Sequence, residues 1–136
     1  QGGGLTLDTM HAGGLCGMAT FLDPSITTAD NLSGQVVARK GDLPEVHTSV
    51  SINVHLMSHM VAGDDASPEK IQPLRNNEML MLNVATATSV GVTRNAEKTK
   101  TDLDLRLPIC ADKGQRISLS RRVGSRWRLI GYGTIV

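Results

Sequence analysis

The residues best suited to chemistry gather at the C-terminal end, where no acidic residue follows Asp112. An arginine guanidinium binds phosphate through paired hydrogen bonds and stacks on flat rings, and a lysine adds a compact charge. The stretch RRVGSRWRLIGYG also holds the chain's only Trp and only Tyr. We therefore predict RNA contact by six cations in the last 24 residues. They are Lys113, Arg116, Arg121, Arg122, Arg126 and Arg128. The alternative is that the arginine stems cover apolar surface while Trp127 fills a core.

The histidines and paired carboxylates are weaker candidates. His55 lies on an expected strand, where the four residues to His59 span about 13 Å, so one metal ion cannot join them unless the chain turns first. We expect these histidines, with His47, to face solvent. Asp102 and Asp104 share a strand face without a convergent His, which indicates a solvated face.

No catalytic motif accompanies these residues. Ser118 and Ser120 lack a nucleophile-elbow context, and the glycine runs at residues 2–4 and 13–14 lack the Lys-Ser/Thr pair of a phosphate-binding loop. The sequence therefore predicts no enzyme activity, no metal and no cofactor in this chain.

The charge of the chain is uneven although its net value is only +1. Residues 1–69 hold eight acidic and two basic residues, whereas residues 70–136 hold twelve basic and five acidic. This gradient indicates either two structural units or one unit with two partners. Cys16 and Cys110 are isolated, which favours buried free thiols and a reducing, cytoplasmic location. No apolar run approaches the length of a membrane span, so we expect no membrane contact.

Strand patterns must position these residues. Apolar and polar residues alternate strictly in residues 49–57 (SVSINVHLM), which predicts a half-buried strand. The run 79–85 (MLMLNVA) suits a central strand buried on both faces. Alternation also predicts strands in residues 103–107 and 116–120, joined through the turn 112–114.

From residue 126 the pattern alternates again and predicts a closing strand. Trp127, Leu129 and Ile135 are expected on its core side, and Arg126 and Arg128 on the other. Several short strands with polar turns, at residues 95–100 and in the loop 63–73, predict an all-β fold with a small antiparallel β-barrel.

The motifs resemble, in order, the C-terminal part of the gamma subunit of archaeal and eukaryotic translation initiation factor 2. The segment FLDPSITTADNLSG resembles the end of that family's second domain, through Leu22, Asp23, Pro24, Thr27, Asp30, Leu32 and Gly34. The remainder resembles its third domain and ends in a long signature. Its residues are Pro108, Cys110, Gly114, Arg116, Ser120, Arg121, Arg122 and 126–133. The resemblance implies that residues 1–40 are the last strands of an incomplete second-domain barrel and residues 41–136 a third-domain barrel.

The resemblance also implies a role in translation initiation. The family is a GTPase that uses GTP and Mg²⁺, forms a heterotrimer with alpha and beta subunits, and delivers methionylated initiator tRNA to the small ribosomal subunit. The GxxxxGK[ST] and NKxD motifs are missing from these 136 residues, so the family's GTPase activity is not expected here. We expect a non-catalytic barrel module whose third-domain surface faces RNA.

Two other functions fit the residues less closely. A free-standing β-barrel adaptor could use the same fold for protein binding alone. The selenocysteine-specific elongation factor shares the architecture but is not expected to end in RWRLIGYG. Because neighbouring domains would be missing, we also expect edge strands near residues 13–21 and self-association of the chain.

Overall fold

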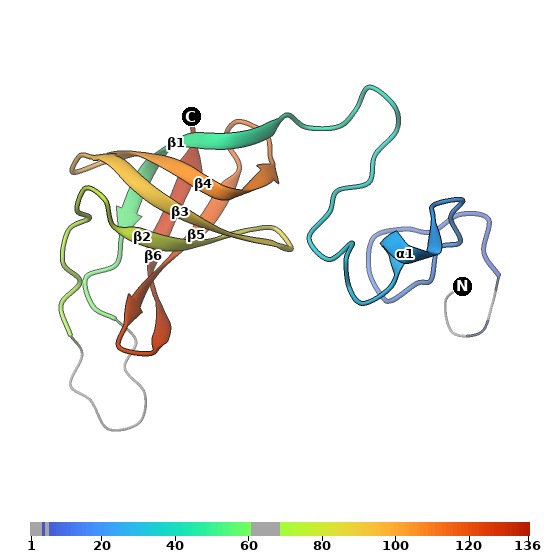
Figure 1. The fold of residues 1–136 in the computed structure, drawn as a ribbon, viewed down its shortest axis with the longest axis horizontal. Helices are drawn as coiled ribbons and strands as arrows, with labels where there is room; N and C mark the ends of the chain where they lie inside the picture. The colour runs from blue at the N-terminus through green and yellow to red at the C-terminus, as the bar shows by residue number, and fades with distance from the viewer. Residues whose placement is uncertain (1–3, 5, 61–68) are drawn as a thin grey trace. The chain divides into compact units, whose positions relative to one another are not determined.

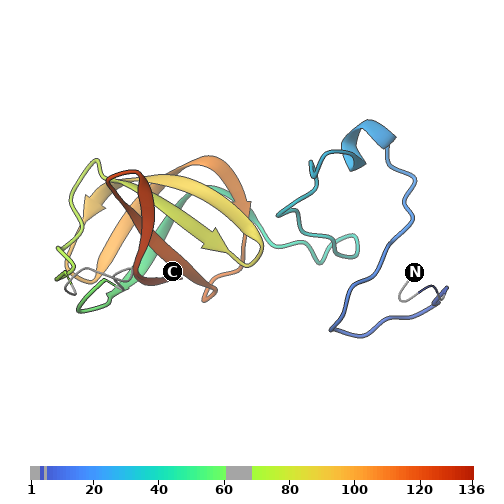
Figure 2. The ribbon, with the colours of Figure 1, turned by 90° about the horizontal axis from the view of Figure 1, so that it is seen from below.

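Six antiparallel strands close into a barrel in the computed structural model, which describes residues 4, 6–60 and 69–136 (Figure 1). The strands are β1 (Val46–Leu56), β2 (Met79–Val84), β3 (Ala87–Ala96), β4 (Lys100–Cys110), β5 (Arg116–Val123) and β6 (Arg126–Ile135). Their order around the barrel is β1-β4-β3-β2-β5-β6, and β6 pairs with β1 to close it. Figure 2 shows the ring from a perpendicular direction. The predicted all-β barrel is confirmed.

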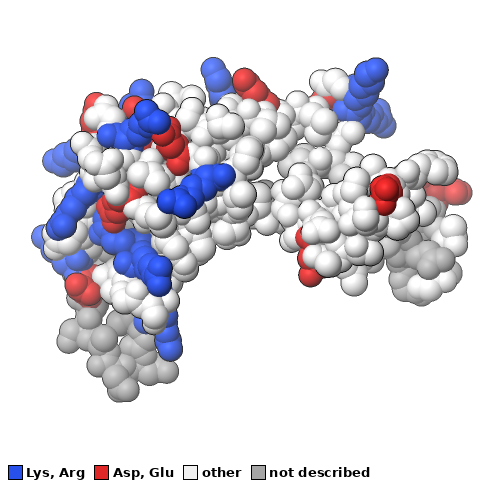
Figure 3. All heavy atoms as spheres, in the orientation of Figure 1, with Lys and Arg blue, Asp and Glu red and all other residues white. Residues whose placement is uncertain are grey.

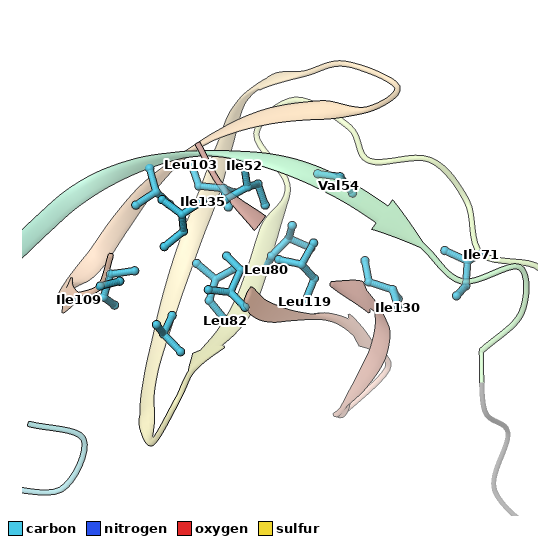
Figure 4. Close-up of a cluster of buried hydrophobic side chains, with 14 residues drawn as sticks. Ile52, Val54, Ile71, Leu80, Leu82, Leu103, Ile109, Leu119, Ile130 and Ile135 are labelled. Atoms are coloured by element: carbon cyan, nitrogen blue, oxygen red, sulfur yellow. The ribbon is translucent and has the colours of Figure 1, made fainter. Parts of the chain in front are cut away.

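Alternating side chains fill the interior of the barrel. Ile52, Leu80, Leu82, Leu119 and Ile130 are completely buried, and they come from β1, β2, β5 and β6 (Figure 4). Because each strand turns every second side chain inward, five of the strands supply apolar side chains to this one core, while the inward positions of β3 hold the buried Ser89 and Thr93. Polar residues on the opposite faces stay near solvent, as in residues 49–57.

A bulge shifts the alternation of inward and outward side chains in β6 by one residue. Opposite β5, Leu119 pairs with Gly131 but Ser120 pairs with Leu129, so Ile130 is the extra residue. Ile130 is therefore fully buried, whereas Leu129 is 47% exposed and Trp127 is only partly buried. The prediction that Leu129 and Trp127 fill the core was wrong, because a strict alternation cannot account for the inserted residue. The prediction was right for Ile135.

The outer face of β2 is also more open than predicted. Its burial alternates, with Leu80, Leu82 and Val84 inside but Met79 43% exposed and Met81 partly buried. A strand of a closed barrel has one inner and one outer face, so burial on both faces requires a further layer that the described residues do not supply.

The chain before the barrel behaves differently. The structure divides into two units, Gln1–Leu32 and Ser33–Val136. Among the described residues before Val46 there is one short helix, α1 (Pro24–Thr27), and no strand, so the expected strands near residues 13–21 are not found. A strand needs a neighbouring strand to form hydrogen bonds with. Among the described residues before Val46 there is no strand that could pair with this segment. The assignment of residues 1–40 to a second barrel stays a prediction.

The predictions about the cysteines are confirmed only in part. Both cysteines are free thiols, as predicted, but Cys16 is exposed and only Cys110 is partly buried. Within the described residues, no helix is long and apolar enough to cross a membrane. The predicted loop 63–73 falls partly outside the described residues. Its described part, residues 69–73, is exposed apart from Ile71.

Candidate nucleic-acid interface

The six predicted cations do not form one surface. Arg116 pairs with Thr134 at one end of β5, whereas Arg122 pairs with Trp127 at the other end. The six residue steps from Arg116 to Arg122 span about 20 Å along an extended strand. Lys113, in the turn before β5, lies at the Arg116 end. The candidates therefore divide into two groups at opposite ends of the barrel.

Arg116 belongs to a row of flat groups on the outside of the barrel. The rings of Tyr132 and His55, which are paired across β6 and β1, stack with centroids 4.9 Å apart. The guanidinium carbon of Arg116 lies 5.3 Å from the centre of the Tyr132 ring. Cation–π contact holds the guanidinium against the ring and leaves its edges toward solvent. Arg116 is thus available to an anion.

Arg121 points the other way. It pairs with Leu80, which is fully buried, and it shares the inner side of β5 with Ile117 and Leu119. At the open end of the barrel its guanidinium forms a salt bridge with Glu78, and both side chains are largely buried, at 16% and 18% exposure. It also donates to the carbonyl oxygens of Gln72 at 2.9 Å and Pro73 at 3.1 Å. This arginine is engaged within the protein.

The other three arginines of the β5–β6 hairpin remain open. Arg122 and Arg126 are exposed, and Arg128 is partly buried. In the described part of the chain none of the three forms an ion pair with a carboxylate. Trp127, opposite Arg122, lies outside the buried core beside them. We call Arg122, Arg126, Trp127 and Arg128 the hairpin cluster.

Antiparallel topology brings further cations to the end of the barrel that carries the hairpin cluster. The ends of β1 and β3 and the starts of β2 and β4 meet there, so cations from two connections, β1–β2 and β3–β4, join those of the hairpin. They are Lys70, Arg75, Lys98 and Lys100. Figure 3 shows Lys and Arg side chains spread over this part of the barrel, with fewer acidic side chains between them. Sequence reasoning missed these cations because they are 20 to 50 positions from the hairpin; the strand order was the signal that could have found them.

The histidines and carboxylates have structural partners. His47 Nε2 lies 3.0 Å from the carbonyl oxygen of Ala111, and His59 lies beside Ser58. The hydroxyl of Ser51 donates to Asp102 at 2.6 Å, and Asp104 pairs with Arg94. In the residues that the structure describes, no group of three His, Cys, Asp or Glu side chains could hold a metal ion.

Comparison with known proteins adds independent information. The sequence profile described as "Initiation factor eIF2 gamma, C terminal" matches residues 48–135. Translation initiation factor 2 subunit gamma from Methanococcus aeolicus is 50% identical over 133 residues, which cover 98% of this chain and 32% of the relative. The subunit from Methanothermobacter thermautotrophicus is 47% identical with the same coverage. The one from Haloquadratum walsbyi is 43% identical over 99% of this chain and 32% of the relative.

The chain thus spans about one third of the length of these relatives. The matched profile includes every strand of the barrel except the first residues of β1, and it contains the whole hairpin cluster. Fold, terminal signature and comparisons agree: the chain belongs to the family of translation initiation factor 2 gamma subunits and corresponds to their C-terminal part.

Proposed function

We propose that this chain serves translation initiation as a non-catalytic barrel module that contacts RNA through the hairpin cluster. The supporting observation is that Arg122, Arg126 and Arg128 stand at one end of the barrel without carboxylate partners in the described chain. Guanidinium groups without carboxylate partners suit phosphate recognition, because their donors are free to form paired hydrogen bonds with phosphate oxygens.

The wider setting follows from the family. In a complete gamma subunit, the module would act beside alpha and beta subunits while methionylated initiator tRNA is delivered to the small ribosomal subunit in the cytoplasm. GTP and Mg²⁺ would belong to the part of the relatives that this chain does not span. Residues 41–136 would form the third-domain barrel, and residues 1–40 would complete the second.

The test is a triple variant, R122Q/R126Q/R128Q, in the complete gamma subunit assembled with its partners. Affinity for initiator tRNA and for the small ribosomal subunit is measured between 50 and 200 mM salt. Each lost phosphate contact lowers the salt slope by about 1, so we expect a slope reduced by up to about 3 for the RNA that the hairpin touches. The control R39Q/K40Q/R106Q removes the same charge elsewhere and should leave that slope nearly unchanged. Unchanged slopes for both RNAs would overturn the proposal.

Protein binding is the second candidate, favoured by an apolar row on the outside of the barrel. Val90, Met81, Ser120 and Leu129 lie opposite one another across β3, β2, β5 and β6. Leu129 is 47% exposed and Met81 and Val90 are partly exposed, although Ser120 between them is buried. Apolar side chains that stay partly exposed on a surface occur at protein interfaces. The variant M81E tests this function, with N83E on the same outer face as its control. If M81E alone fails to assemble with the alpha and beta subunits, the barrel binds protein through this row.

A further inference from the structure

Arg121 is held in place by a network that uses its whole guanidinium. Nε and Nη2 both donate to the carboxylate of Glu78, while Nη1 donates to Gln72 and Nη2 also to Pro73. Four of its five N–H groups are thereby occupied, and the side chain is only 16% exposed. A phosphate could reach it only by displacing these partners.

The same network holds residues 72–78, which lead into β2. The carboxylate of Glu78 accepts the backbone N–H of Arg75 at 3.0 Å, and the hydroxyl of Thr93 donates to the carbonyl oxygen of Arg75. Earlier in the chain, Lys70 forms an isolated antiparallel β-bridge with His59. Both cationic side chains, Lys70 and Arg75, are exposed, and they line the same hollow as Glu78 and Arg121.

We propose that Arg121 is a positioning residue, not an RNA contact: bound to Glu78, it fixes the segment that presents Lys70 and Arg75 beside the hairpin cluster. This inference rests on the proposed RNA contact, and it explains how the part of the RNA-binding surface that contains Lys70 and Arg75 is held in place. Glu78 then favours RNA binding although its own charge repels RNA.

The two effects of Glu78 on RNA affinity have opposite signs, and this allows a direct test. E78Q and E97Q each remove one negative charge from the same end of the barrel. Glu97 is exposed, however, and within the described residues its carboxylate accepts only the side-chain amide of Asn95. If charge alone matters, both variants bind RNA more tightly. If Arg121 acts by positioning, E97Q binds the same or more tightly while E78Q binds about tenfold more weakly. Binding of initiator tRNA and of the small ribosomal subunit is measured on the complete gamma subunit.

R121K adds a second measurement that keeps the charge. A lysine ammonium cannot bind Glu78 in a paired manner and reach two carbonyl oxygens as well. We expect R121K to weaken binding about as much as E78Q and to speed amide hydrogen exchange at Arg75. R106K, at an exposed position outside the hairpin cluster, should bind RNA as the parent does. Urea unfolding of each variant confirms that the barrel remains folded.

The outcomes separate the two levels of the proposal. Tighter binding by E78Q, or parental binding by R121K, overturns the positioning role while the hairpin contact stands. An unchanged salt slope for R122Q/R126Q/R128Q overturns the RNA contact itself, and the inference falls with it.

Discussion

Gly131 lies where β6 approaches β1 most closely. A Cβ at this position would stand 2.2 Å from the carbonyl oxygen of His55 and 2.9 Å from the Cα of Leu56. Both are backbone atoms, so relief requires the two strands to separate. At Gly133 the nearest atom is the end of the Ile52 side chain, at 2.8 Å, which can rotate.

We therefore expect G131A to destabilise the barrel by about 3 kcal/mol or more and G133A by about 1 kcal/mol. Urea unfolding followed by tryptophan fluorescence measures both. G124A is the control, since Gly124 has a positive φ but open space around it, and should cost about 1 kcal/mol from backbone strain alone. Equal effects of G131A and G133A would contradict a backbone clash.

Thr93 is the second residue on which the barrel end depends. It is fully buried, and its hydroxyl donates to Arg75 while accepting the N–H of Glu78 at 2.8 Å. T93V keeps the shape but leaves two backbone groups without this partner, so we expect a loss of about 1 to 3 kcal/mol. T88V, at an exposed position on the same strand, should change the free energy of unfolding by less than about 0.5 kcal/mol.

The arginines show how far the candidate site could be predicted. Composition was enough to single out the C-terminal cations; Arg122 and Arg126 are exposed and Arg128 is partly buried, and their contact with RNA stays a prediction. The role of Arg121 was missed although the alternation of Ile117 and Leu119 already places it on the inner side of β5. Its partner Glu78 is 43 positions away, and only the closed strand order brings the two together.

At the level of elements, strands with strict alternation were predicted well. Residues 49–57 correspond to the main part of β1, and the turn at 112–114 joins β4 to β5. Prediction failed in β6, because a bulge is an insertion in one strand relative to its neighbour and leaves no mark in a single strand's pattern. The cations of the connecting loops were missed for a similar reason, since proximity in the barrel depends on pairing.

Helix α1 offers a pH-dependent element. The side chain of Ser25 hydrogen-bonds to the carboxylate of Asp23, and the backbone N–H of Ser25 donates to the same carboxylate at 2.8 Å; together they hold the pKa of Asp23 below its ordinary value of 3.8. A lowered pKa means that the capping interaction is complete above 3.8 and is lost as pH falls through the lower value.

We expect the amide proton of Ser25 to shift in an NMR titration with a midpoint below 3.8. In D23N the neutral side-chain amide oxygen accepts the same hydrogen bond, so the chemical shift of the Ser25 amide proton should be independent of pH in this range. A midpoint at or above 3.8 in the parent would mean that the cap does not favour the charged carboxylate.

For the whole molecule, the division into two units has a direct test. The barrel core is supplied entirely by residues 50–135, and the unit that contains it begins at Ser33. A chain starting at Ser33 should therefore unfold in urea at the same midpoint as the parent, within about 0.5 kcal/mol of free energy. A clearly lower midpoint would show that residues 1–32 stabilise the barrel.

The first unit also predicts association. Leu15, Met18 and Phe21 are 92%, 67% and 112% exposed, and exposed apolar side chains in sequence favour contact between molecules. We expect the parent to self-associate in sedimentation experiments and the chain from Ser33 to sediment as a monomer. The variant L15S/M18S/F21S should behave like the shortened chain; a monomeric parent would contradict the expectation.

Closure of the barrel by β1 and β6 determines when the protein can fold during its synthesis. Ile52 pairs with Ile135, 83 positions later, so the first strand lacks one of its two neighbours until β6 has been synthesised. Every earlier nascent chain exposes the open edges of β1 and β5, which can pair with other polypeptides. All ten residues of β6 must therefore leave the ribosome before the barrel can close, and a product truncated within β6 would be an aggregation hazard instead of a slightly shorter barrel.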